Sequence, residues 1–265
     1  MISNFLNLFE DIFFNEKYSS LNFIIQKIDP RVKIFSSIAL ISIAILAKSI
    51  LTLIILTSII FILSIVSRIP LKIFLIRTSL IPLFTTLIAL PLIFITPGNQ
   101  ILNLNFINIT TEGVHKALIF ILRVWTCVNS LILLTLTTKF SNIINAMEKL
   151  KIPKIFTVMI SITYRFIFLS INEAYRMLLA KESRTFKKES RLKEIKTLAS
   201  MLSTLFIRSY ERGERVYLAM MARGYNGSVN NLEKMSINRR DVVFILIVLF
   251  ICIIALSSEY FLGVS

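Results

Sequence analysis

Residues 34–66 read IFSSIALISIAILAKSILTLIILTSIIFILSIV and carry a single charged side chain, Lys48. A single helix of this length would be about 50 Å long, whereas the hydrocarbon core of a bilayer is about 30 Å thick. We therefore expect two short helices that turn at Lys48 and Ser49, with one strongly tilted helix as the alternative. In either case, the stretch predicts a helical protein that lies in a membrane.

Further apolar runs extend this interpretation to most of the chain. They cover residues 79–95, 117–137 and 242–258, in a protein of 265 residues that is 55% hydrophobic and only 17% charged. A soluble domain carries about 25% charged residues. We expect an all-α integral membrane protein with about five transmembrane helices plus long cytoplasmic helices. The predicted parts are a membrane part at 1–138, a helical part at 139–240 and a final span at 241–265.

Positive charge is distributed unevenly between the connecting segments. Residues 67–78 hold three basic residues, residues 96–111 hold none, and residues 139–240 hold 20 Lys and Arg against 8 Asp and Glu. Basic residues gather on the cytoplasmic side of membrane proteins. We therefore expect a multi-pass protein of the cell membrane, with the N-terminus and 139–240 cytoplasmic, the loop 96–116 outside and the C-terminus outside.

The segment 139–240 itself predicts a series of helices. A short amphipathic helix is expected at 140–150, and Pro153 suits the first turn of a second helix that reaches about Phe186. Ser190 is a suitable N-cap for a third helix over 191–223. Gly224 then occupies a position where helices commonly end.

No motif for catalysis or cofactor binding is present in the sequence. There is no G-x-x-x-x-G-K-[ST] phosphate loop, and the one histidine is His115. Cys127 and Cys252 have no metal-ligand spacing. We expect a chain that is not an enzyme and that binds neither a metal nor a cofactor.

Two arginines, Arg123 and Arg165, fall in apolar surroundings. Buried cations in membranes are costly and often mark function. The favoured interpretation is that each reaches a helix end or pairs inside the bundle. The alternative is a self-contained secondary transporter that uses both arginines to bind an anion.

Two similar tetrapeptides stand at the predicted helix ends, Ser183-Arg184-Thr185-Phe186 and Ala222-Arg223-Gly224-Tyr225. Each arginine suits the negative end of a helix dipole, so a simple cap is one interpretation. The repetition favours another, in which two copies of one partner dock. The helix between the two motifs would be about 48 Å long, too long for one ligand to reach both arginines.

The helix that leads to the second tetrapeptide carries charges of both signs. Its candidate supporting residues are Arg208, Glu211, Arg212, Glu214 and Arg215. Glu211 and Arg215 form an i,i+4 pair in the favourable order. The interleaved acids argue against a helix that binds nucleic acid or anionic lipid.

Nearly the whole chain resembles the transmembrane (T) component of energy-coupling factor (ECF) ABC transporters, in its cobalt-type CbiQ-like branch. The matching stretches are IDPRVKI at 28–34, LKIPKIFTVMISITYRFIFLSINEAYRM at 150–177 and RSYERGERVYLAMMARGYNG at 208–227. The resemblance implies a membrane scaffold that docks two ABC ATPase subunits and a substrate-capture membrane subunit, with ATP on the ATPases. It implies cobalt as the substrate, with nickel or a vitamin as alternatives.

The same resemblance makes Arg184 and Arg223 the docking arginines, each at the centre of an Ala-Arg-Gly signature. Ala222 and Gly224 match that signature. Ser183 and Thr185 stand where the family has Ala and Gly, so the first copy departs from the pattern.

Overall fold

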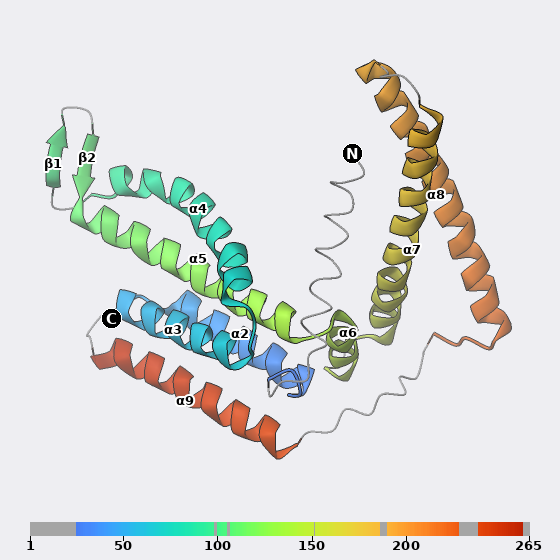
Figure 1. Cartoon of the computed structure of the whole chain (residues 1–265). Helices are drawn as coiled ribbons and strands as arrows, with labels where there is room; N and C mark the ends of the chain where they lie inside the picture. Colours follow the sequence, from blue (N-terminus) through green and yellow to red (C-terminus); the bar gives the residue numbers. More distant parts are fainter. Residues whose placement is uncertain are drawn as a thin grey trace. The chain divides into compact units, whose positions relative to one another are not determined.

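The computed structural model describes residues 25–97, 100–104, 107–150, 152–185, 190–227 and 238–261. Apart from one short hairpin, the regular structure in these ranges is helical, which confirms the all-α membrane fold class (Figure 1). The elements are α2 (Pro30–Leu46), α3 (Ile50–Val66), α4 (Leu71–Ile95), β1 (Gln100–Leu104), β2 (Ile107–Thr110), α5 (Thr111–Thr137), α6 (Phe140–Lys149), α7 (Lys154–Arg184), α8 (Arg191–Ala222) and α9 (Arg239–Phe261).

The chain forms two compact units. The described residues of one unit lie within Ile144–Lys234, and those of the other lie within Asn15–Ile143 and Met235–Ser265. The first unit contains α7 and α8, and the second contains α2 to α5 and α9. The division predicted at residues 138 and 240 stays a prediction.

The apolar stretch 34–66 forms two helices. The α2 helix ends at Leu46, and Ser49 caps α3 by accepting the backbone N–H of Leu51 at 3.3 Å. A serine side chain that satisfies a free N–H favours a helix start at this point. The expected turn at Lys48 and Ser49 is confirmed, and the alternative of one tilted helix is wrong.

Three helices of the described ranges are long and apolar enough to cross a bilayer, namely α4, α5 and α7, and α3 is a shorter apolar helix. The α7 helix belongs to the segment that we predicted to be cytoplasmic. Its length and hydropathy would nevertheless allow it to enter the bilayer. The final apolar run forms α9 as expected. The number of spans and the sidedness stay predictions.

The α4 helix begins earlier than the sequence predicts. We expected a basic loop over 67–78, but the helix starts at Leu71 after Pro70 and takes in Lys72 and Arg77. Proline is well tolerated at a helix start, and none of the next residues stops the helix. Its two internal prolines, Pro82 and Pro91, account for the curvature of α4 in Figure 1.

A short antiparallel hairpin joins α4 to α5, where we expected only a loop. In its register, Asn103 lies opposite Asn108 and Leu104 opposite Ile107. The alternation of apolar and polar residues in ILNLNFINIT over 101–110 is the period-two pattern of a strand. That signal was present in the sequence and was missed.

The unit of α2 to α5 and α9 is apolar outside and partly polar inside. Leu83, Leu87 and Ile95 on α4 are strongly exposed, as suits contact with lipid. Small polar residues lie buried between the helices together with apolar ones, among them Thr52, Ser64, Thr78, Thr126, Asn129 and Ser130. Small side chains let membrane helices approach closely. Such close packing stabilises the bundle in lipid, where burial away from water does not drive helices together.

Candidate functional site

The α7 and α8 helices form an antiparallel pair that ion pairs hold together. Near the connected ends, Lys181 Nζ lies 3.3 Å from Glu194 Oε1. Further along, Glu173 of α7 contacts Arg208 and Arg212 of α8. Because the pairing moves backward along α7 as it moves forward along α8, the two helices run in opposite directions, as Figure 1 shows.

The contact at Glu173 uses both oxygens of one carboxylate. Arg212 Nη2 donates to Oε2 at 2.6 Å, and Arg208 Nη1 donates to Oε1 at 3.2 Å. The Glu173 side chain is only 16% exposed and that of Arg212 only 25%. Charge-assisted bonds of this kind are stronger than neutral ones. Two of the predicted supporting residues therefore join α8 to α7.

The other predicted supporting residues do not join the helices. Arg215 lies 3.8 Å from Glu211 on the same helix, and both side chains are exposed. An exposed i,i+4 pair stabilises a helix by only about 0.3–0.5 kcal/mol. Glu214 is exposed as well.

The second arginine signature ends α8 in a left-handed turn. Gly224 has a φ of 78°, a conformation that favours glycine. Its N–H donates to Met221 O at 3.0 Å, and the N–H of Tyr225 donates to Met220 O at 3.0 Å. These two bonds form a Schellman cap. Gly224 thus ends the helix as predicted and leaves Arg223 exposed at the cap.

The first signature ends α7 by different means. Arg184 is the last helical residue, and Thr185 has a φ of −103°. The Thr185 hydroxyl donates to Lys181 O at 2.8 Å, and the Ser183 hydroxyl donates to Leu179 O at 2.9 Å. Thr185 therefore satisfies a carbonyl of the last turn with its own hydroxyl, without a left-handed glycine, and Ser183 bonds back to the preceding turn.

The two signature arginines are exposed, and neither has an ion-pair partner within the described ranges. Arg223 and Arg165 line one hollow of about 410 Å³ between α6, α7 and α8, together with Glu148. The structure thus brings Arg165 to the α8 tip. Arg184 lies at the opposite, connected end of the helix pair.

Arg123 of α5 belongs to the other unit and has a structural partner. Its Nη2 donates to the carbonyl oxygen of Ala47 at 2.7 Å, and Ala47 is the C-cap of α2. A cation at a helix C-terminus compensates the dipole and satisfies a free carbonyl. This contact fits the interpretation of Arg123 as a residue paired inside the bundle.

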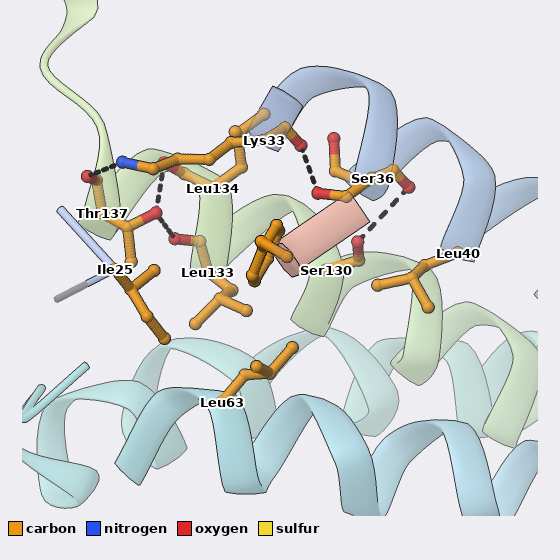
Figure 2. Close-up of a pocket in the computed structure, with 11 residues that line it drawn as sticks. Ile25, Lys33, Ser36, Leu40, Leu63, Ser130, Leu133, Leu134 and Thr137 are labelled. Atoms are coloured by element: carbon orange, nitrogen blue, oxygen red, sulfur yellow. Dashed lines mark hydrogen bonds between the residues drawn. The ribbon is translucent and has the colours of Figure 1, made fainter. Parts of the chain in front are cut away.

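A buried charged cluster in the unit of α2 to α5 and α9 was missed by the sequence reasoning. It contains Asp29, Lys33 and Asp241, which are 6%, 4% and 2% exposed. Lys33 Nζ donates to Thr137 O at 3.0 Å, across to the end of α5, as Figure 2 shows. The signal was present in IDPRVKI, because an aspartate before a proline marks a helix start.

Asp29 and Asp241 are both capping residues. The Asp29 carboxylate accepts the N–H of Arg31 at 2.9 Å at the start of α2. The Asp241 carboxylate accepts the N–H of Asn238 at 2.7 Å at the start of α9. The cluster therefore ties the first turns of two helices to the end of a third.

The described ranges contain no group of three or more His, Cys, Asp or Glu side chains that could hold a metal ion. Cys127 and Cys252 are free thiols. What the geometry offers instead is a pair of long helices with an exposed arginine at each tip.

The sequence of the chain is similar to those of known transport proteins. A family model described as cobalt transport protein, CbiQ, matches residues 22–237. An uncharacterized protein of Methanocaldococcus jannaschii is 38% identical over 243 residues, which cover 89% of this chain and 83% of the relative.

Two further relatives carry the name energy-coupling factor transporter transmembrane protein EcfT. The one from Listeria innocua is 32% identical over 224 residues, covering 80% of this chain and 84% of its own. The one from Streptococcus thermophilus is 29% identical over 240 residues, covering 85% and 90%.

The fold is that of a helical membrane protein, with several apolar helices and a pair of long helices tipped by arginines. The chain belongs to the CbiQ cobalt transport protein family.

Proposed function

We propose that this chain is the transmembrane energy-coupling component of an ECF-type ABC importer. The observation that carries the proposal is the pair α7 and α8, with Arg184 and Arg223 exposed at its opposite ends. No residue of α8 is buried, and α7 buries only Thr157. Long helices with so little burial within the chain suit a role as docking elements for other subunits.

Two ABC ATPase subunits are the proposed partners of the tips. Arginine presents a rigid fork of donors that matches a carboxylate, so an acidic groove on each ATPase is the expected counterpart. In this proposal the chain is not catalytic and binds no cofactor, and ATP binds to the ATPases. Closure of the ATPases moves the tips, and the helices transmit this movement to the membrane part.

A separate membrane subunit captures the substrate in this proposal. The family description and the sequence resemblance favour cobalt ion, and nickel or a vitamin are the alternatives. The N-terminus and residues 139–240 would lie on the cytoplasmic side, where the ATPases are, and the C-terminus outside. The apolar character of α7 is compatible with a helix that rests partly in the bilayer.

Charge reversal at the tips tests the proposal. Arg223→Glu should abolish co-purification with the ATPases, because a carboxylate would meet an acidic groove, while insertion into the membrane is retained. Arg215→Glu is the matched control, since it makes the same change on the same helix about two turns before the tip. Unchanged co-purification and uptake in Arg223→Glu would refute the proposal.

The same reversal at Arg184 tests the first signature separately. If α7 also docks an ATPase, Arg184→Glu should lower the amount of ATPase recovered per chain. A silent Arg184→Glu together with a disruptive Arg223→Glu would restrict docking to the α8 tip.

Reconstitution of the chain alone tests the alternative of a secondary transporter. Transport by this chain in liposomes without ATP or partner subunits would support that alternative and contradict the coupling role.

A further inference from the structure

The contact of Glu173 with Arg208 and Arg212 lies midway between the two arginine tips of the helix pair. Glu173 precedes Arg184 by 11 residues on α7, and Arg212 precedes Arg223 by 11 residues on α8. At 1.5 Å per residue each tip is therefore about 16 Å from the contact. Because the helices are antiparallel, the two tips lie on opposite sides of it. The contact is the midpoint between the two exposed arginines.

Little apolar packing holds the two helices in register near this midpoint. No residue of α8 is buried. Beside the contact lies an open groove lined by Phe166, Ser170, Ser209 and Gly213, among others. An ideal Cβ placed on Gly213 would meet no atom within 4 Å. The groove shows that α7 and α8 do not interdigitate there as packed helices do.

Ion pairs therefore carry the orientation of α8 on α7. Within the described ranges, the interhelical ion pairs are Lys181 with Glu194, close to the connection, and Glu173 with Arg208 and Arg212. The first pair lies where the chain connection already limits the separation. The second lies far from it, so it has the larger effect on where the α8 tip is held.

The chemistry of the contact also makes it dependent on Glu173 alone. Arg208 and Arg212 lie one helical turn apart, and each takes one oxygen of the same carboxylate. Without the Glu173 charge, two like charges would remain side by side and repel each other. Loss of this one carboxylate therefore removes the interhelical attraction and leaves two unpaired like charges next to each other on α8.

We propose that Glu173 is a positioning residue. Its contact with Arg208 and Arg212, here called the fulcrum, holds α7 and α8 together at one point, so that movement of one arginine tip is passed to the other. This inference rests on the proposed coupling function. Glu173 acts through Arg208 and Arg212, and it does not itself contact the ATPases.

Distances between spin labels test the fulcrum on the chain itself, in lipid nanodiscs. In a background without Cys127 and Cys252, labels at Met159 and Leu218 report the open end of the helix pair. Labels at Leu179 and Ile195 report the connected end. All four side chains are exposed. Glu173→Gln should broaden and lengthen the first distance distribution and leave the second unchanged.

Glu211→Gln is the matched control, because it removes an equal charge from a pair that lies within α8 alone. The exchange of Glu173→Arg with Arg212→Glu should restore the wild-type distribution at least in part. If Glu173→Gln does not insert, the double change Arg208→Gln and Arg212→Gln removes the same contact from the other helix. Distributions equal to the control would overturn the proposal.

A functional readout separates failure of the fulcrum from failure of the coupling role. In proteoliposomes that contain the ATPases and the capture subunit, Glu173→Gln should retain ATPase co-purification, since both tips remain. It should lower the Co²⁺ accumulated per ATP hydrolysed several-fold. An unchanged ratio in Glu173→Gln would overturn the fulcrum. Absence of ATPase co-purification in the wild-type chain would instead overturn the coupling role, and the label distances would still decide the fulcrum.

Discussion

The carboxylate of Asp241 accepts the backbone N–H of Asp29 at 2.9 Å, although 212 positions separate the two residues in the chain. The same carboxylate caps α9 by accepting the N–H of Asn238. One buried side chain therefore satisfies a free donor at the start of α9 and another just before α2. Together with Lys33, which reaches the end of α5, it joins three helix ends.

Replacement of Asp241 should lower the stability of the membrane unit. Asp241→Ala removes the acceptor for two backbone donors, and a buried unsatisfied donor costs about 1–3 kcal/mol. We expect a loss of about 2–4 kcal/mol, measured as a lower midpoint of thermal or denaturant unfolding in detergent. Glu112→Ala is the control, because Glu112 is an exposed acid in the first turn of α5. Equal effects of the two variants would contradict the capping role.

Replacement of Lys33 tests the same cluster from the cationic side. Lys33→Met keeps most of the side-chain volume but leaves Thr137 O and Gln26 O without this donor. It also removes a cation that attracts Asp29 and Asp241. We expect a loss of about 2–4 kcal/mol in the free energy of unfolding. The exposed Lys27→Met should have little effect, and similar loss in both variants would argue against a specific role.

The left-handed turn at the α8 tip predicts opposite effects for two glycine substitutions. Gly224→Ala places a Cβ at a φ of 78° and should cost about 1–2 kcal/mol. The cap would loosen, and ATPase co-purification should fall because Arg223 is displaced. Gly213→Ala has open space and should stabilise helix α8 by about 1 kcal/mol. Circular dichroism of the two variants compares their helicity, and a stabilising Gly224→Ala would contradict the cap.

A third glycine marks a close approach between α4 and α5. A Cβ on Gly113 would lie 2.7 Å from the carbonyl oxygen of Ile93 and 2.5 Å from Thr96 Oγ1. Overpacking of this kind costs about 1–3 kcal/mol. We therefore expect Gly113→Ala to lower the unfolding midpoint and the yield of folded protein. A yield and midpoint equal to those of Gly213→Ala would show that the helices part without cost.

Features that depend on neighbouring residues were predictable from the sequence. The turn at Lys48 and the stop at Gly224 each follow from one local side chain or backbone preference. Helix α8 begins after Ser190 as predicted, although the Ser190 side chain makes no capping hydrogen bond. The start of α4 was missed because three basic residues suggested a loop, whereas charged residues are compatible with a helix near a membrane surface. Charge placement alone therefore did not mark the start of α4.

Features that depend on distant residues were not predictable in the same way. The contact of Asp241 with Asp29 and that of Glu173 with Arg212 join separate helices, and no local pattern specifies such a pairing. The supporting role of Arg208 and Arg212 was predicted, but the residue that they bind was not. Glu173 follows a long apolar stretch of α7, and an acidic residue in such a place is a signal that deserved a partner search.

The different endings of α7 and α8 give the proposed complex a polarity. One arginine is followed by a left-handed glycine, and the other by a threonine whose hydroxyl is bound to its own helix. Two identical ATPases would therefore meet unlike backbones at Arg184 and Arg223. Two identical ATPase subunits would then act on an asymmetric scaffold. The forces that they exert on the α7 tip and on the α8 tip would differ in each cycle.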